Sequence, residues 1–295
     1  MPLFMCLSGF LYAKLTKISN IEEYGLFIKK KFINLSIPYL VFYVAYVGIN
    51  MIFASSVNSQ KGMNDLLNIF TEPMPPFWFL YALFFIFLIV PIIEKIFKNN
   101  YNFVFGIFII LHILEIFIHT PIYAINIVCE YGVYFYLGKI IFNNVNKIFN
   151  NKRKVVLNIL AFIILGVVYS FILEKQIIDY KLMNILKFML AILGTVASMQ
   201  LFKILENKFV HIKIINYMDK YTFPIYLMHT MFSACIRIVL LKVGIFNFYI
   251  HFILGLLFGM LGPTIVAIIL KKSKYGEIVL YPLNTIKKMK MESLK

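Results

Sequence analysis

The stretch from Phe248 to Leu270, FYIHFILGLLFGMLGPTIVAIIL, contains no acidic residue, no lysine and no arginine. A helix of about 20 apolar residues crosses the hydrocarbon core of a membrane, so this stretch predicts a transmembrane helix. Similar apolar stretches recur along the whole chain, with short polar segments between them. The chain is 61% hydrophobic and 14% charged, whereas soluble domains are about half apolar and a quarter charged. The sequence therefore predicts an all-α, polytopic transmembrane helix bundle.

Nine transmembrane helices are expected from these stretches, and the first is shorter than the others. No internal repeat and no Gly/Ser-rich or Pro-rich linker separates them. Residues 1–270 are therefore predicted to form one membrane bundle, followed by a basic cytoplasmic tail at 271–295. The expected helices are 1–12, 36–54, 77–93, 101–118, 121–142, 155–173, 184–202, 223–241 and 248–270.

The positive charge of the chain predicts its orientation in the membrane. The net charge is +16 at pH 7, and basic residues near the ends of spans are retained in the cytoplasm. The protein is therefore expected to be a multi-pass protein of the cell membrane with a cytoplasmic C-terminus. The same placement explains the charge without nucleic acid, which is not an expected partner. The basic segments are alternate connections and the tail, at 14–35, 94–100, 143–154, 203–222 and 271–295.

The N-terminal stretch MPLFMCLSGF, residues 1–10, is apolar from its first residue. It lacks the charged leader of a signal peptide. Nine helices with a cytoplasmic C-terminus would place Met1 outside the cell, and one more helix before Met1 would return the N-terminus to the cytoplasm. We therefore expect residues 1–10 to belong to the second helix of a ten-helix bundle.

Ionisable side chains inside membrane spans are candidates for function, because their burial in lipid is costly. His112, Glu115 and His119 follow one another at i, i+3 and i+7, which places them on one stripe of a helix. They are candidate catalytic residues, since a carboxylate beside imidazoles can act as a base or a proton relay. The alternative is a set of interhelical hydrogen bonds that stabilises the bundle. The spacing does not match HExxH, and no metal is expected.

Other ionisable residues in spans have fewer neighbours in the sequence. Glu130 needs a cationic or hydrogen-bonding partner, and Arg237 is the clearest cation available to it or to Glu115. Such a pair would be structural or would bind an anionic or sugar substrate. His229 is either a packing residue or a fourth catalytic candidate, and Lys139 is expected to extend towards water at the end of its span.

Aromatic and basic clusters border the membrane at two further places. Trp78 follows the proline-rich segment PMPP at 73–76 and is expected to anchor the membrane interface and to be a candidate substrate contact. The cluster Lys29, Lys30 and Lys31 either enforces topology or binds the phosphates of a cytoplasmic cofactor. The motifs of soluble-type catalytic modules, such as G-x-S-x-G and the phosphate-binding glycine loop, are absent from the sequence.

Several of these landmarks, in this order, resemble the integral-membrane acyltransferases of the acyltransferase 3 type. Met1–Phe4 with Ser8-Gly9-Phe10 resembles the family's second helix, and Lys29–Lys31 with Ile37-Pro38-Tyr39 resembles the basic approach to its third. The other matching motifs are Trp78-Phe79-Leu80 with Leu83, Tyr134-Phe135-Tyr136-Leu137-Gly138 and Tyr226-Leu227-Met228-His229.

The resemblance implies ten helices and an acyl-CoA donor, with acetyl-CoA as the expected form, on the cytoplasmic side. It implies a sugar or polysaccharide of the cell envelope as the acceptor, and a key histidine and arginine on the first helix. We expect that helix to lie before Met1, so the chain is expected to carry the scaffold and part of the site. The alternatives are a polysaccharide flippase and a degenerate, non-catalytic family member.

Overall fold

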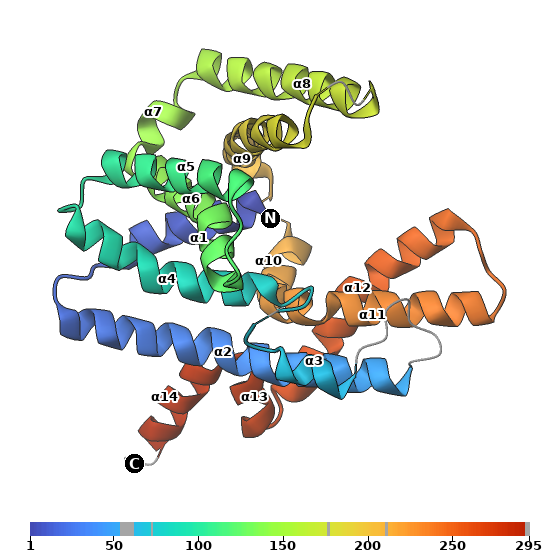
Figure 1. Cartoon of the computed structure of the whole chain (residues 1–295). Helices are drawn as coiled ribbons and strands as arrows, with labels where there is room; N and C mark the ends of the chain where they lie inside the picture. Colours follow the sequence, from blue (N-terminus) through green and yellow to red (C-terminus); the bar gives the residue numbers. More distant parts are fainter. Residues whose placement is uncertain (54–61, 72, 176–177, 210–211, 293–295) are drawn as a thin grey trace. The chain divides into compact units, whose positions relative to one another are not determined.

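The computed structural model describes residues 1–53, 62–71, 73–175, 178–209 and 212–292 (Figure 1). Every regular element in these ranges is a helix, which confirms the predicted all-α class. The helices are α1 (Pro2–Leu15), α2 (Ile21–Ile52), α3 (Met63–Leu67), α4 (Trp78–Ile96), α5 (Tyr101–Phe117), α6 (Tyr123–Asn143), α7 (Val145–Phe149), α8 (Lys152–Lys175), α9 (Tyr180–Phe209), α10 (Lys213–Asp219), α11 (Thr222–Lys242), α12 (Phe248–Leu270), α13 (Lys274–Leu280) and α14 (Pro282–Glu292).

Among the described helices, seven are long and apolar enough to cross a membrane, and α1 and α5 are shorter apolar helices. Each of the nine predicted spans overlaps one of these nine helices. Residue 54, the last of the predicted span 36–54, lies outside the described residues. The outer surface fits a bilayer: on α8, the side chains of Leu157, Ile164 and Val167 are 63–65% exposed. Apolar faces of this extent favour lipid over water. The protein is a multi-pass membrane protein built as a helix bundle.

The chain divides into two compact units. Unit 1 comprises residues 1–24 and 85–211, and unit 2 comprises residues 25–84 and 212–295. Both units are therefore assembled from segments far apart in the sequence. The helices α2 and α4 contribute residues to both.

Unit 1 is centred on the packing of α1 against α6. The buried face of α1 contains Met5, Cys6, Gly9 and Tyr12, whose spacing matches one stripe of a helix. A β-carbon on Gly9 would collide with the backbone carbonyl of Phe135 on α6. Small residues at such positions allow membrane helices to approach closely, where dispersion forces act over many atoms.

A buried ion pair in unit 1 joins α4 to α6. Lys139 Nζ lies 2.6 Å from Glu94 Oε1, and the Tyr12 hydroxyl donates to Glu94 Oε2 at 3.1 Å. The ammonium group also lies over the ring of Tyr12. Lys139 therefore does not extend towards water as the sequence suggested, because the Glu94 carboxylate of α4 is close enough to pair with it.

The helix α2 begins well before the predicted span. Segment 14–35 was expected to be a connection, but residues 21–35 belong to this helix of 32 residues. Asn20 caps the helix by accepting a hydrogen bond from the Glu23 amide at 2.8 Å. The segment is also rich in leucine, isoleucine, lysine and glutamate, which are good or moderate helix formers. A helix of this length spans about 48 Å, so it extends beyond the hydrocarbon core.

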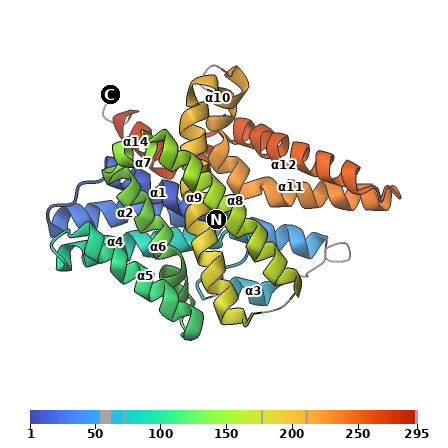
Figure 2. The same cartoon turned by 90° about the horizontal axis from the view of Figure 1, so that it is seen from above.

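Unit 2 also contains the hairpin of α11 and α12, which lie side by side in Figure 2. Gly259 and Gly262 of α12 face Ser233 and Phe232 of α11 at short range, and the Ser233 hydroxyl donates to the Gly255 carbonyl at 2.9 Å. The core of this unit is aromatic and aliphatic, with Tyr39, Phe42, Tyr43, Phe77, Leu80, Leu227, Met228 and Met231 among its buried residues.

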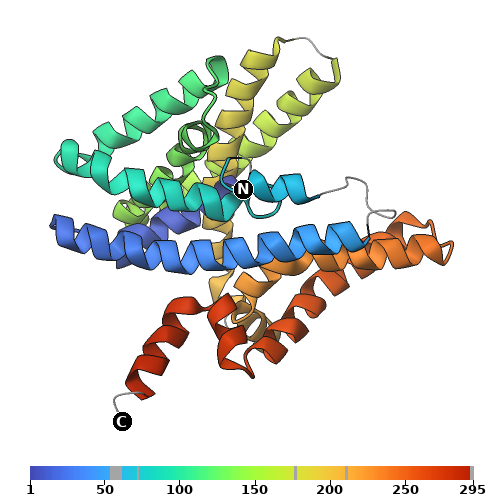
Figure 3. The same ribbon diagram turned by 60° about the horizontal axis from the view of Figure 1, so that its bottom comes forward.

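The C-terminal segment folds onto unit 2 as α13 and α14, seen in red in Figure 3. Leu280 is buried in the core of this unit, and Thr285 is also buried. The Leu283 amide donates to Asn34 Oδ1 of α2 at 3.4 Å. The helix α13 and the first residues of α14 are therefore a packed part of the unit.

Candidate active site

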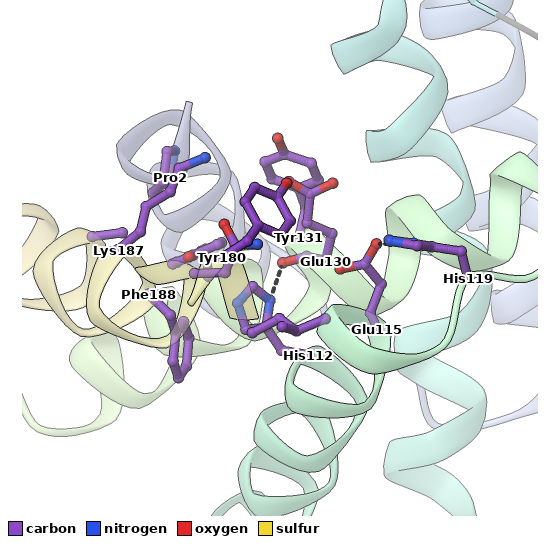
Figure 4. A pocket seen from close by; sticks show the side chains of 13 residues that line it. Pro2, His112, Glu115, His119, Glu130, Tyr131, Tyr180, Lys187 and Phe188 are labelled. Atoms are coloured by element: carbon purple, nitrogen blue, oxygen red, sulfur yellow. Dashed lines mark hydrogen bonds and ion pairs between the residues drawn. The ribbon is translucent and has the colours of Figure 1, made fainter. Parts of the chain in front are cut away.

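A cavity of about 300 Å³ lies in unit 1, where α5, α6 and α9 meet the start of α1 (Figure 4). It contains His112, Glu115, His119 and Glu130, which the sequence placed in the two spans 101–118 and 121–142 or at their junction; Lys139, at the end of the second of these spans, does not line it. The lining residues are Pro2, His112, Glu115, Ile116, His119, Glu130, Tyr131, Tyr134, Tyr180, Asn184, Lys187, Phe188 and Ala191.

His112 is the buried histidine of the cavity, with 5% of its surface exposed. Its Nδ1 lies 2.8 Å from the backbone carbonyl of Glu130 on α6, a contact in which Nδ1–H donates. In the neutral ring, this bond leaves Nε2 as an acceptor. The ring packs on Phe188 of α9 at a centroid distance of 4.2 Å. Two helices thus fix its tautomer and its orientation.

Glu115 and His119 form a second pair. His119 Nδ1 lies 3.0 Å from Glu115 Oε1, and the two side chains are 68% and 13% exposed, respectively. The helix ends at Phe117 and the backbone of Ile118 is extended, so His119 lies outside the helix on which the sequence placed its stripe. The chain nevertheless turns His119 back towards Glu115 (Figure 4). A carboxylate on Nδ1 leaves Nε2 free for an incoming group.

Two carboxylates and one lysine set the charge of the cavity. The Glu130 carboxylate interacts electrostatically with Glu115, Lys187 and His119, and Lys187 also acts on His112. Such a mixture of acceptors, bases and one cation can orient a polyhydroxylated molecule and remove a proton from it. The described residues contain no cluster of three or more histidine, cysteine, aspartate or glutamate side chains arranged to hold a metal ion.

The sequence did not assign Lys187, Asn184 and Tyr180 to the site. All three lie on α9 and line the cavity. The sequence did contain an indication for Lys187, because this lysine lies inside a predicted span and a charged residue in a span is a candidate for function. Asn184 is the first residue of that predicted span and Tyr180 precedes it, where polar residues are common, so their sequence context gave no such signal.

The remaining candidates lie in unit 2. His229 Nδ1 bonds to backbone carbonyls of its own helix, at 3.0 Å from Ile225 and 2.9 Å from Tyr226. Arg237 is on α11, so its pairing with Glu115 or Glu130 stays a prediction. Trp78 begins α4 and packs edge-on against Phe79.

The lysine cluster of unit 2 lies within α2. Lys29 and Lys30 are exposed, while Lys31 is partly buried and lies over the ring of Phe27, 5.4 Å from its centroid. Lys29 and Lys30 are therefore accessible to a charged ligand, which stays a predicted role for this cluster.

The fold and the cavity define a helical membrane protein with a titratable site between its helices. The chain matches the acyltransferase 3 family, described as an acyltransferase domain, over residues 1–272. This match covers most of the 295 residues, and the chain belongs to that family. No curated protein and no solved structure matches it.

Proposed function

We propose that the protein transfers an acyl group, most simply acetyl, from cytoplasmic acyl-CoA to a hydroxyl group of a cell-envelope sugar or polysaccharide. Membership of the acyltransferase 3 family supports the reaction class. The positive-inside pattern of the loops supports a cell-membrane location with a cytoplasmic C-terminus. The donor and the acceptor follow from the resemblance to the family.

The observation that carries the proposal is the Glu115–His119 pair at the cavity. The carboxylate holds Nδ1 of the imidazole at 3.0 Å and favours the imidazolium that forms when Nε2 takes a proton. His119 is then the base that removes the proton of the acceptor hydroxyl. The hydroxyl oxygen attacks the thioester carbonyl carbon, the C–S bond breaks, and the thiolate leaves.

The size of the cavity and the hydrogen-bonding groups of its other residues match a sugar acceptor. A space of about 300 Å³ is at the small end of ligand sites and accommodates a sugar unit. Glu130 and Asn184 offer acceptors for sugar hydroxyls, and Lys187 offers a donor. His112 Nε2 offers a further acceptor in the buried part of the cavity. The histidine and arginine that the resemblance assigns to a preceding helix stay a separate prediction.

The test uses purified protein in lipid nanodiscs with radiolabelled acetyl-CoA and a panel of sugars and polysaccharides. We expect label in the glycan that mild alkali releases, as an O-ester would. His119→Gln and Glu115→Gln should lower kcat, the former by about 100-fold, the usual scale for loss of a general base. His251→Gln is the matched control, because His251 belongs to unit 2 and does not line the cavity. Its Nε2 lies 2.7 Å from the Ile245 carbonyl.

Two outcomes would count against the proposal. Transfer that is unchanged in His119→Gln and Glu115→Gln would exclude this pair as the catalytic base. An absence of transfer across the whole panel, together with movement of glycan across vesicles that contain the protein, would favour a flippase.

A further inference from the structure

Unit 2 contains an open cleft of about 570 Å³, and three of its six lining residues are lysines. It lies where α11 begins and α12 ends, and the turn between α13 and α14 closes one side. Since α11 and α12 are both membrane-spanning in length and composition, the cleft is at a membrane boundary. Its lining residues are Lys220, Lys271, Glu277, Tyr281, Asn284 and Lys288.

Lys271 is the central cation of this cleft. Its Nζ lies 4.8 Å from the ring centroid of Tyr221 and 4.8 Å from that of Tyr281. The Tyr281 hydroxyl donates to the Lys220 carbonyl at 3.1 Å, and burial raises the pKa of this phenol, so it stays protonated. The two rings hold the ammonium group in place while its side chain remains exposed.

The charges of the cleft do not cancel. Lys288 pairs with Glu277, with 2.8 Å between Nζ and Oε1. Within the described part of the chain, neither Lys220 nor Lys271 forms an ion pair with a carboxylate. Lys271 at the end of α12 also compensates the helix dipole. That role does not account for Lys220 and Lys288, which reach the same cleft from other elements.

We propose that this cleft binds a phosphoryl group. Lysine ammonium groups bind phosphate as point charges, and basic pockets at membrane boundaries bind lipid head groups. Two sources present this chemistry: the nucleotide of an acyl-CoA donor and the head group of an anionic phospholipid. Only the first source rests on the proposed function.

The first experiment measures nucleotide binding without turnover. Isothermal titration calorimetry of the detergent-purified protein compares coenzyme A with dephospho-coenzyme A, which lacks the 3′-phosphate. If the donor is the source, coenzyme A binds more tightly, and Lys271→Gln weakens its binding roughly tenfold, the scale of one charged hydrogen bond. Lys220→Gln is a second variant, because this exposed side chain is dispensable for packing.

The second experiment measures lipid binding. Native mass spectrometry counts the phosphatidylglycerol and phosphatidylcholine molecules retained from mixed nanodiscs. If the lipid is the source, Lys271→Gln and Lys220→Gln retain less phosphatidylglycerol and bind coenzyme A as the wild type does. Lys147→Gln is the control, because Lys147 belongs to a separate basic cluster with Arg153 and Lys154 in unit 1.

The proposal is overturned if both variants bind both ligands as the wild type does, or if Lys147→Gln loses as much binding as they do. Neither experiment requires acyl transfer. If the wild-type protein binds phosphate in the cleft but transfers no acyl group, only the proposed function is contradicted. If it transfers the acyl group but binds no phosphate in the cleft, only the proposal for the cleft is contradicted.

Discussion

Gly138 of α6 lies directly against the backbone carbonyl of Cys6 on α1, and a β-carbon at this position would collide with that oxygen. Gly9 makes the reciprocal contact with Phe135. The two glycines therefore set the distance between the helices at the centre of unit 1. Because both contacts are to backbone atoms, no change of side-chain rotamer relieves them.

Gly138→Ala is therefore expected to lower the free energy of unfolding by about 1–3 kcal/mol, the usual cost of overpacking. Gly9→Ala should behave similarly. Gly106→Ala, on α5 in the same unit, is the control, since a β-carbon there meets nothing within 4 Å. Thermal unfolding in detergent measures all three variants, and equal midpoints for Gly138→Ala and Gly106→Ala would contradict this account of the packing.

The helices themselves followed from the sequence, because apolar stretches of membrane length are a strong signal. All nine expected spans have a corresponding helix. The polar first half of α2 was missed because loop charge and helix formation are independent: residues such as Lys29 and Lys30 mark a membrane boundary and still favour helix. The charge pattern indicated where the apolar span begins and not where the helix begins.

The candidate site was predicted in part. His112, Glu115 and His119 lie within eight residues of one another in the sequence. Their spacing alone therefore predicted that they would lie close together. Lys187 comes from α9, and its approach to Glu130 depends on how the helices pack. Side-chain spacing along one helix carries no information on that packing, which explains why the wall formed by α9 was not predicted.

The Glu94–Lys139 pair makes the stability of unit 1 sensitive to one charge. Lys139→Met leaves a buried carboxylate without its cation, and we expect a loss of about 3–5 kcal/mol in the free energy of unfolding. Glu94→Gln should also destabilise. The double variant should recover part of the loss, since it removes the uncompensated charge, and a double-mutant cycle measures this coupling. Strictly additive losses would show that the two groups do not interact.

The packing of the C-terminal segment makes a further prediction. Leu280 is 1% exposed, while Tyr275 on the same short helix is 83% exposed. Leu280→Ala should therefore lower the free energy of unfolding by about 2–5 kcal/mol, the usual range for such a truncation in a core. Tyr275→Ala should change it little. Limited proteolysis after residue 270 provides the readout, and equal cleavage rates for the two variants would argue against docking of α13.

Lys187 is expected to contribute to binding of the acceptor more than to the chemical step. It lines the cavity with Glu130 and His112, and loss of one charged hydrogen bond costs about 1.5–3 kcal/mol. Lys187→Met should therefore raise the KM for the glycan roughly tenfold or more, with a smaller change in kcat. Lys181→Met is the matched control on α9, because the Lys181 ammonium lies over the ring of Phe117, 5.3 Å from its centroid.

Steady-state transfer at several acceptor concentrations separates the two constants. A fall in kcat at unchanged KM would instead place the ammonium group next to the charge that develops in the transition state. If Lys181→Met raised the KM as much as Lys187→Met, the two lysines would act only through their general electrostatic effect and Lys187 would not contact the acceptor. Lys187→Arg should retain most of the affinity if the cation itself binds the acceptor, because it preserves the charge and supplies further donors.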